Sequence, residues 1–494
     1  MKALVVFLAF LCCIGANQDV QNAIQLLREK LNGGDANQAK LQFTLGLLLE
    51  STPDADVGEI ASLYREAGSS PSLEVTKRLD SLCRSARVYH ETLGDLSQAA
   101  ECYRQALLLV EDPDHVGEVL QQATPVLIPE ASNHISLAKD LVRKFPNHAM
   151  VHQFHGALLR KLGKSTEAYQ AYHLATLQFQ QSDPTKAEAL ILAAAAARKA
   201  GVDTETQMKY LQAAQTLDLS NDASTLADLY NQMGVVQKHG GNRDAAVQYF
   251  QQALQAKKDD GHAMAQLASL NVDMSGVQSL DAEYVKDLFD GYSSHFEHDL
   301  LETLEYRGHE MTVNSLKRAW TTCEKKSPIV IDLGCGTGLV GEQIAKWKKV
   351  NIIGIDLSES MIQQAKYRTM DGVPIYSEVH QQDAHGFLRG ILAGSIDAIV
   401  AADVFIYIGD IDDLLALCVQ SLVEGGLVVF TVESTFLTGL RLLPSGRFGH
   451  SKAYIEQVAS KHGLAVIEWK DDVLRKQRGA DVAGASVVLQ KQQP

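Results

Sequence analysis

The sequence predicts a multidomain protein, with an N-terminal all-α solenoid of helical repeats followed by a Rossmann-like α/β domain. A pattern of small and aromatic residues recurs with a period of about 34 residues in the first half. From residue 329, strand and helix patterns alternate, which predicts a mainly parallel sheet of seven strands. The last two strands are joined by a loop too short for a crossover helix, so the final strand is expected to be antiparallel. A chain of 494 residues is also too long for one ordinary domain.

The chain begins with a short apolar segment. Lys2 precedes an uncharged run at 3–14, and two small residues follow that run. A basic start, an apolar core and a small-residue exit are typical of a secretory signal peptide, and the run is short for a membrane span. We therefore interpret residues 1–16 as a leader to the secretory pathway, the lumen of the endoplasmic reticulum or an organelle. A buried first helix is the alternative, and an uncleaved leader would leave the chain cytoplasmic.

Composition and charge exclude several classes of protein. The composition is that of a soluble globular protein, with 46% hydrophobic and 21% charged residues. A net charge of −15 disfavours nucleic acid as a partner. The cysteines after the leader lack the spacing of a disulfide framework or a metal site, so no metal is expected. They are Cys83, Cys102, Cys323, Cys335 and Cys418.

Residues 18–275 are predicted to form tetratricopeptide-like helical repeats. Three units share a turn glycine, a small residue and an aromatic residue: Gly94, Ala99 and Tyr103; Gly163, Ala168 and Tyr172; Gly241, Ala246 and Phe250. Small residues let two helices cross closely, and the aromatic ring fills the gap to the neighbouring unit. The proline residues expected to close repeats are Pro113, Pro146 and Pro184. Such an array either holds a protein partner or only positions the following domain.

Residues 329–338 carry the strongest chemical signal in the chain. A β-branched strand ends at Asp332, and Gly334, Gly336 and Gly338 follow before a helix at 339–347. Glycines let the backbone approach a ligand, and the helix N-terminus offers unpaired N–H groups.

Two nucleotide-type ligands fit this glycine loop. A dinucleotide requires G-x-G-x-x-G, which Gly336, Gly338 and Gly341 satisfy. S-adenosylmethionine requires an acid followed two residues later by G-x-G-x-G, which the chain also satisfies. Asp332 favours S-adenosylmethionine, because its carboxylate can bind the ammonium group of an amino acid and would repel a pyrophosphate. An NAD-dependent dehydrogenase remains the alternative.

Acidic residues also close the next three predicted strands. Asp356, which precedes Leu357, lies 22 residues after Gly334, where a carboxylate can bind both hydroxyls of an adenosine ribose. Asp383 and Ala384 follow the third strand, where an acid can contact the adenine amino group. Asp403 ends the fourth strand.

These motifs resemble the class I S-adenosylmethionine-dependent methyltransferases, and more closely the group with tetratricopeptide repeats ahead of the catalytic domain. Two further boxes carry the resemblance, at 402–410 and 444–451. It covers about residues 280 to 490, so we assign 280–494 to the methyltransferase domain. The resemblance implies that Tyr292 and Phe296 close over the donor, whereas Phe289 is expected to pack.

The remaining strands follow from their apolar runs, and the pair Gly425–Gly426 is expected to end the helix before the fifth strand. The predicted strands are 329–333, 352–356, 375–380, 396–402, 427–433, 464–469 and 484–490.

The acceptor site is predicted beside the fourth and fifth strand ends. Asp403 is the candidate for orienting the acceptor or accepting a proton, although it could also cap a helix or contact only the donor. Tyr407 could supply a hydroxyl group, and His450 could act as a general base. Arg447 suits a carboxylate or phosphate group, and Glu433 is a further candidate for substrate binding. Weaker candidates are Tyr306, Arg307, Arg475 and Arg478.

The sequence thus predicts methyl transfer to an unidentified acceptor, favouring a small and acidic molecule bound by Arg447. The alternative is a protein methyltransferase whose repeats hold the polypeptide substrate. Neither the nucleophile nor an obligatory base can be read from these residues.

Overall fold

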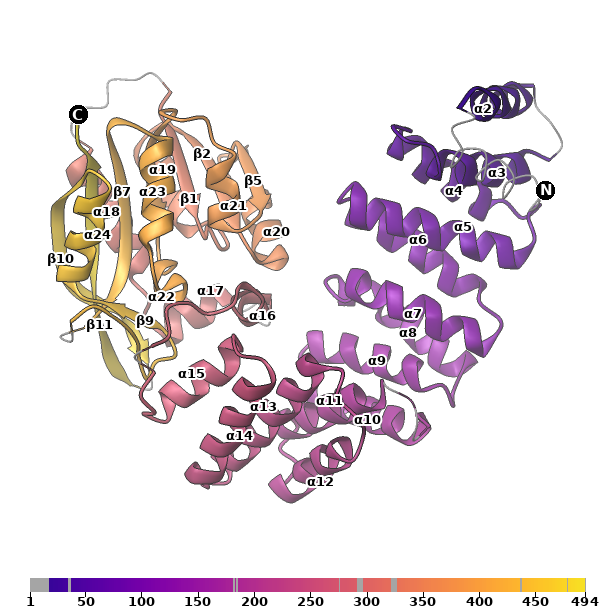
Figure 1. Ribbon diagram of the computed structural model, residues 1–494, viewed down its shortest axis with the longest axis horizontal. Coiled ribbons are helices and arrows are strands. Elements are labelled where there is room, and N and C mark those ends of the chain that lie inside the picture. The colour runs from indigo at the N-terminus through magenta and orange to yellow at the C-terminus, as the bar shows by residue number, and fades with distance from the viewer. Residues whose placement is uncertain are drawn as a thin grey trace. The chain divides into compact units, whose positions relative to one another are not determined.

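The computed structural model describes residues 17–33, 37–180, 183, 185–274, 276–290, 296–320, 327–435, 438–477 and 479–493 (Figure 1). The chain forms two compact units, which divide between Leu217 and Asp218. The predicted leader lies outside the described residues. None of the described helices combines the length and apolar character that crossing a bilayer requires. Within the same residues, no group of three His, Cys, Asp or Glu side chains could hold a metal ion.

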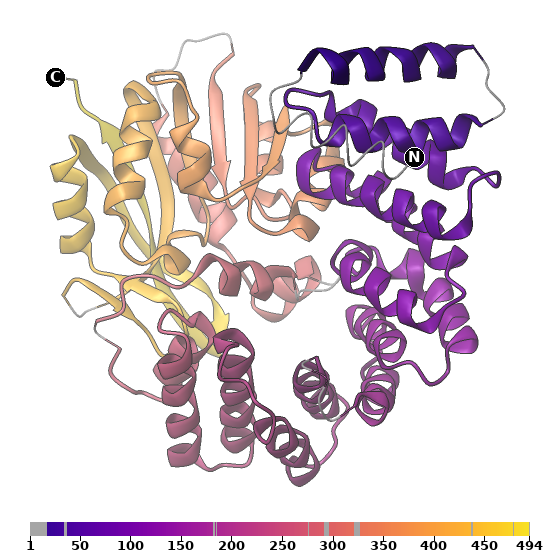
Figure 2. The ribbon, with the colours of Figure 1, turned by 45° about the vertical axis from the view of Figure 1, so that its right-hand side comes forward.

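The first unit consists of helices that stack in antiparallel pairs (Figures 1 and 2). They are α2 (Asn17–Asn32), α3 (Gln38–Glu50), α4 (Val57–Ser69), α5 (Val75–Arg87) with the π-turn η1 (Val88–Thr92), α6 (Leu96–Leu109), α7 (Pro113–Leu127), α8 (Ala131–Lys144), α9 (Ala149–Lys161), α10 (Ser165–Gln178), α11 (Lys186–Lys199) and α12 (Thr204–Gln215). The predicted all-α solenoid is therefore confirmed.

The repeat pattern has the packing role that was expected of it. A Cβ atom on Gly156 of α9 would lie 3.1 Å from the ring of Tyr172 in α10, so the absence of a side chain there permits the crossing. Gly163 makes the turn between these helices with a left-handed φ of +72°. Pro113 follows the end of α6 and is also the first residue of α7, where its missing N–H costs nothing. Pro146 does follow a helix end, whereas Pro184 lies outside the described residues.

The second unit begins with three helices of the repeat type, α13 (Ala223–His239), α14 (Arg243–Ala256) and α15 (Gly261–Ser269). They lie side by side in Figure 2. The boundary between the two compact units thus falls well before residue 275, where the sequence analysis placed the end of the repeats.

We expect Gly234→Ala to lower the midpoint of thermal unfolding of the second unit. A Cβ atom at Gly234 in α13 would lie 2.6 Å from the ring of Phe250 in α14. Forcing these helices apart costs about 1–3 kcal/mol, which outweighs the better helix propensity of alanine. Gly240→Ala is the control, because its Cβ would meet no atom closer than 3.4 Å. All three tryptophans (320, 347 and 469) lie in the second unit, so their fluorescence reports its unfolding. Equal midpoints for the two variants would contradict close packing at Gly234.

The rest of the second unit is the α/β domain. Its helices are α16 (Ala282–Asp290), α17 (Phe296–His298) with the π-turn η2 (Asp299–Thr303), α18 (Gly308–Ala319), α19 (Leu339–Trp347), α20 (Glu359–Tyr367), α21 (Ala384–Arg389), α22 (Phe405–Ile408), α23 (Asp412–Ser421) and α24 (Lys452–Lys461). Its strands are β1 (Ile329–Leu333), β2 (Asn351–Asp356), β3 (Thr369–Met370), β4 (Val373–Pro374), β5 (Glu378–Gln381), β6 (Ile396–Ala401), β7 (Leu422–Ser434), β8 (Leu440–Leu442), β9 (Phe448–His450), β10 (Leu464–Gln477) and β11 (Ala480–Lys491).

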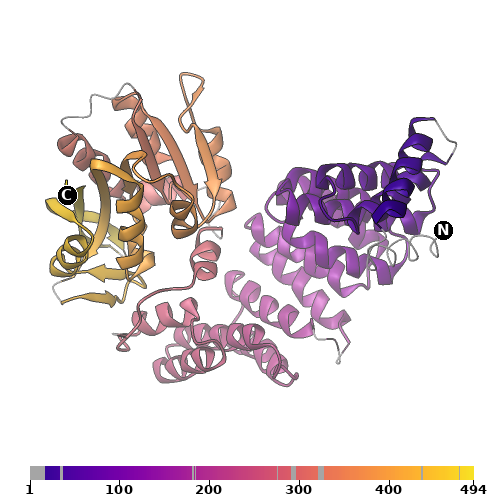
Figure 3. The same ribbon diagram turned by 45° about the horizontal axis from the view of Figure 1, so that its top comes forward.

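The main path of the sheet has the order β10-β11-β7-β6-β1-β2-β5. Strands β5, β2, β1, β6 and β7 run parallel, while β11 is antiparallel to both β7 and β10, as predicted. Successive residues of β1 face opposite sides, so Val330 packs in the apolar cluster with α18 and α19, and Ile331 in the cluster with α23 and α24. Helices therefore cover both faces of the sheet (Figures 1 and 3).

Several details differ from the sequence prediction. The strand predicted at 375–380 is observed as the shorter β5 (Glu378–Gln381). Strands β10 and β11 continue well beyond their predicted ends and meet in a tight hairpin, because their polar residues still pair along the ladder. Helix α23 ends at Ser421, and the left-handed Gly425 lies within β7 instead of ending the helix. The segment 444–451 includes β9, which forms a small hairpin with β8 and runs parallel to the carboxyl end of β7.

Candidate functional site

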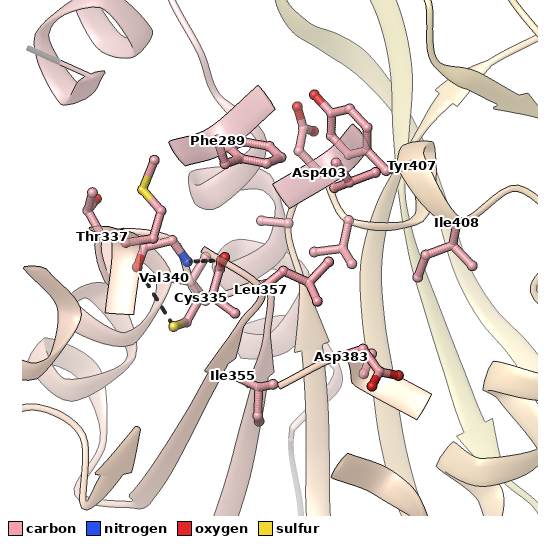
Figure 4. Close-up of a pocket in the computed structure, with 18 of the residues that line it drawn as sticks. Phe289, Cys335, Thr337, Val340, Ile355, Leu357, Asp383, Asp403, Tyr407 and Ile408 are labelled. Atoms are coloured by element: carbon pink, nitrogen blue, oxygen red, sulfur yellow. Dashed lines mark hydrogen bonds between the residues drawn. The ribbon is translucent and has the colours of Figure 1, made fainter. Parts of the chain in front are cut away.

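A cavity of about 380 Å³ lies at the carboxyl ends of β1, β2 and β6. The end of a parallel sheet is where ligands bind in this class of fold. The lining residues come from the glycine loop, the starts of α20 and α21, the loop after β6, and α16. Figure 4 shows Phe289, Tyr407 and Asp403 close together, away from Asp383.

The glycine loop after β1 is tied to the end of β2. The backbone N–H of Gly336 donates to Oδ2 of Asp356 at 2.9 Å, and the N–H of Cys335 donates to the carbonyl of Ile355 at 2.9 Å. Gly334 and Gly336 line the cavity, and a Cβ atom on Gly336 would meet no protein atom within 4 Å. This face of the loop is therefore open for a ligand to approach the backbone.

Asp356 both fixes the loop and lines the cavity. Its second oxygen accepts the backbone N–H of Ser358 at 2.8 Å. Leu357, Asp383 and Ala384 also line the cavity. Asp383 caps α21 by accepting the N–H of Gly386 at 2.8 Å, which fixes its carboxylate at the cavity edge.

Asp332 lies outside the cavity lining and is fully buried below the loop. Its Oδ2 accepts the hydroxyl of Tyr376 at 2.7 Å, whereas its Oδ1 has no hydrogen-bond partner among the described residues. Burial raises the pKa of Asp332 to about 7. The hydrogen bond from Tyr376 and the nearby backbone N–H of Gly341 oppose this shift, whereas the negative charge of Asp356 adds to it. Gly338 is also outside the lining, because it caps α19, where a Cβ would meet Arg368 at 3.0 Å.

The aromatic residue that the structure places in the cavity lining is not one of the two that were predicted to close over the donor. Tyr292 lies outside the described residues, and Phe296 begins α17 without a described side chain. Phe289, which was expected only to pack, lines the cavity. Its ring meets that of Tyr407 edge to face, with 5.4 Å between centroids.

Asp403 also lines the cavity, in a left-handed conformation (φ +58°) that is uncommon for aspartate. Thr431 of β7 secures it, because the threonine hydroxyl accepts the Asp403 N–H at 2.9 Å and donates to Oδ1 at 3.2 Å. Burial raises the pKa of Asp403, while the charges of Arg475 and Arg447 oppose this shift. Such an immobilised and strained acid at a strand end is typical of a functional position.

Arg475 of β10 is the charged centre of this end of the cavity. It lines the cavity with only 2% of its side chain exposed, bonds Asp403 through Nη1 at 3.2 Å, and forms an ion pair with Glu433. Glu433 also accepts the hydroxyl of Ser445 at 2.8 Å. The prediction that Glu433 binds substrate is therefore corrected, because its oxygens are engaged by Arg475 and Ser445 and it does not line the cavity.

Arg447 and Tyr407 form a second pair in the lining. Nε of Arg447 donates to the Tyr407 hydroxyl at 3.0 Å, and its guanidinium carbon lies 5.6 Å from the ring centroid. Burial lowers the pKa of Arg447, but Tyr407, Glu433 and Asp403 more than compensate, so it is raised overall and the group stays charged. No carboxylate among the described residues lies within ion-pair distance of Arg447.

The prediction that His450 is a general base is also corrected. Its ring is fully buried in β9, outside the cavity lining, and Nε2 donates to the Gly409 carbonyl at 2.7 Å. Burial lowers the pKa of His450 to about 4, so the ring is neutral at physiological pH. It holds α22 against β9 and cannot reach a molecule in the cavity.

Tyr306, a weaker candidate, and His309, which the sequence analysis missed, also line the cavity. Their rings stack with 5.4 Å between centroids. Burial raises the pKa of Tyr306, helped by Asp403, and lowers the pKa of His309. They precede the first strand at the start of α18, where no motif distinguishes a lining residue from a packed one. Arg307 is instead paired with Asp472, and Arg478 lies outside the described residues.

Three family models match the chain. A methyltransferase domain matches residues 330–426, and tetratricopeptide repeats match residues 82–117 and 227–260. The first match includes the glycine loop and the strands from β1, apart from its first residue, to β6. The last match covers most of α13 and all of α14, the two helices that pack closely at Gly234. No curated protein matches the chain.

Solved structures of methyltransferases are similar to part of the chain. A methyltransferase from Methanosarcina mazei is 14% identical, covers 34% of this chain and 95% of its own, and has a TM-score of 0.30. One from Leishmania major is 14% identical, with 37% and 72% coverage and a TM-score of 0.31. A phosphoethanolamine N-methyltransferase from Haemonchus contortus is 18% identical, with 37% and 53% coverage and a TM-score of 0.31.

The residues of the cavity suit the donor that this domain uses. The open face of Gly336 leaves room for a ligand against the backbone, and Asp356 offers carboxylate oxygens beside it. The orphaned Oδ1 of Asp332 lies below the same loop and can accept a hydrogen bond. The chain is therefore a tetratricopeptide-repeat protein that carries a class I S-adenosylmethionine-dependent methyltransferase domain.

Proposed function

We propose that this enzyme methylates a small acidic acceptor, whose anionic group is bound by Arg447. The observation that carries the proposal is a half-buried, charged guanidinium in the cavity lining without a carboxylate ion-pair partner among the described residues. A buried cation is stable only when an opposite charge or strong acceptors surround it. The charges of Asp403 and Glu433 help to keep Arg447 protonated, but both carboxylates form their ion pairs with Arg475, so the Arg447 guanidinium can still bind an anion.

We assign the donor to the part of the cavity formed by the glycine loop and the starts of α20 and α21. Asp356 would accept the ribose hydroxyls, Asp383 the adenine amino group, and Leu357 and Ala384 would contact the adenine ring. When bound, S-adenosylmethionine supplies a methyl group on a positively charged sulfur atom. Asp332, through its orphaned oxygen, is the candidate for binding the ammonium group of the donor, directly or through a water molecule.

The chain's own residues would align the acceptor and exclude water. Asp403, fixed by Thr431 and Arg475, would orient the acceptor or receive its proton. Tyr407 would place a hydroxyl beside the acceptor, and Phe289 would cover the cavity. Any group that loses a proton on methylation could be held in this way, so oxygen, nitrogen and sulfur acceptors all remain compatible.

The direct test is methyl transfer from labelled donor into an extract, with small molecules and proteins separated afterwards. Label in a small acid supports the proposal, whereas label only in protein would support the alternative, a protein methyltransferase. Gly336→Arg is the control, because its side chain would enter the open face of the loop and block the donor. The repeat matches favour a protein partner, which either recruits substrate or regulates the enzyme.

For the acceptor identified in this way, Arg447→Gln is expected to raise KM about 10- to 100-fold and to leave the affinity for S-adenosylhomocysteine within about twofold. A charge-assisted hydrogen bond contributes about 1.5–3 kcal/mol. Steady-state kinetics and calorimetry measure the two effects. Arg441→Gln, in β8 and outside the cavity lining, is the matched control. An unchanged KM in Arg447→Gln would refute the assignment of Arg447.

A further inference from the structure

One wall of the cavity is formed by α16, which precedes the methyltransferase match. Ala282, Val285 and Phe289 of this helix line the cavity, together with Leu280 just before it. Helix α16 packs beside α20, which begins next to Asp356. The position of α16 therefore determines where the apolar wall lies relative to the donor end.

The start of α16 is bonded to the start of α15 through one carboxylate. Oδ1 of Asp281 accepts the N–H of Tyr284 at 2.6 Å, which caps α16. Oδ2 of Asp281 accepts the N–H of Gly261, the first residue of α15, at 2.9 Å. Both N–H groups are at the positive ends of helix dipoles, where a negative charge is stabilising.

Packing reinforces this joint. A Cβ atom on Gly261 would lie 2.8 Å from Tyr284, so the tyrosine of α16 rests on the backbone of α15. Leu280 belongs to an apolar cluster with Ala268 of α15 and Phe448 of β9. Beside them, Lys257 donates to Glu283 at 3.2 Å.

Helix α15 is in turn held by α13, which belongs to the repeat match at 227–260. The buried Asn231 amide donates to both oxygens of Asp260 at 3.0 and 3.1 Å. Asp260 caps α15 by accepting the N–H of Ala263 at 2.6 Å. A continuous set of bonds thus leads from α13 through two helix caps to the cavity wall.

We propose that Asp281 is a positioning residue that fastens the cavity wall to the last repeat, so that α13 to α15 are a working part of the methyltransferase. The proposal rests on the cavity being the donor site. Detachment of α16 would lower the fraction of molecules that can bind the donor, and affinity falls in proportion to that fraction.

Asp281→Asn tests the proposal in the full chain, because asparagine caps a helix as well as aspartate does. Its amide oxygen can keep the bond to Tyr284, whereas its NH₂ group cannot accept from Gly261. Asp281→Ala removes both bonds. The control is Asp222→Asn, the same change at the cap of α13, where the side chain accepts the N–H of Thr225 in its own helix at 2.9 Å.

Calorimetry with S-adenosylhomocysteine should show affinity about 5- to 10-fold weaker in both Asp281 variants, and unchanged in Asp222→Asn. Hydrogen exchange of the α16 amides, measured without ligand, should be faster in Asp281→Asn than in the wild type. The proposal would be overturned if Asp281→Asn kept the affinity and the exchange rates of the wild type while Asp281→Ala changed both. In that case Asp281 would only cap α16. Failure of the wild type to bind S-adenosylhomocysteine would refute the donor site instead, and the exchange rates would still decide whether Asp281 anchors α16.

Discussion

Asp356→Ala is expected to weaken the binding of S-adenosylmethionine by at least about 100-fold. We assign the carboxylate two bonds to the ribose hydroxyls, each worth about 1.5 kcal/mol or more because the acceptor is charged. A loss of about 3 kcal/mol corresponds to a factor of about 100 in affinity. The same change releases the backbone N–H of Gly336, so the glycine loop would also lose its fixed conformation. Calorimetry with the donor and with S-adenosylhomocysteine measures the effect.

The matched control is Asp413→Asn, which removes an exposed charge on α23, outside the cavity lining. Its affinity for the donor should equal that of the wild type, which excludes an effect of net charge. If Asp356→Ala bound the donor normally while remaining folded, the assignment of the donor to this end of the cavity would be wrong. Tight binding of NAD by the wild type, without binding of S-adenosylhomocysteine, would have the same consequence.

The sequence predicted the residues whose position depends on local structure. Asp356 and Asp403 each follow a short apolar strand, and parallel strands bring their carboxyl ends to one edge. The structure accordingly places both in the cavity lining. The antiparallel last strand could be predicted in the same way, because the short connection left no room for a helix.

What the sequence could not predict are pairings between distant segments. Arg475 and Asp403 are 72 residues apart, and neither local pattern indicates that they bond. Glu433 and His450 looked like substrate or catalytic residues because they are polar groups near a strand end. In the folded chain they satisfy buried partners instead, Arg475 for one and the Gly409 carbonyl for the other. Polar residue type indicates that a buried bond is made, but not whether its partner is ligand or protein.

Arg475→Met is expected to destabilise the second unit by about 3–5 kcal/mol, the usual cost of leaving buried charges without their partner. It would leave the carboxylates of Asp403 and Glu433 close together without the cation that now separates them. The rate of methyl transfer should also fall in Arg475→Met, because Asp403 loses one of the two groups that hold its carboxylate. Urea unfolding followed by tryptophan fluorescence measures stability, since all three tryptophans lie in this unit. Arg307→Met, at a half-exposed ion pair with Asp472, should cost less than about 1 kcal/mol.

The loss caused by Arg475→Met should be larger at pH 8 than at pH 5. Burial already raises the pKa of Asp403, and Arg475 is the largest influence that lowers it again. Without Arg475 the pKa rises further above about 3.9, the ordinary value for aspartate. The folded state then holds a proton that the unfolded state releases, so stability falls as the pH rises through this interval. Adding Glu433→Gln to the variant removes one of the two facing charges and should restore part of the stability at pH 8. A loss that is independent of pH and unaffected by Glu433→Gln would mean that Arg475 contributes by packing its aliphatic stem and not by its charge.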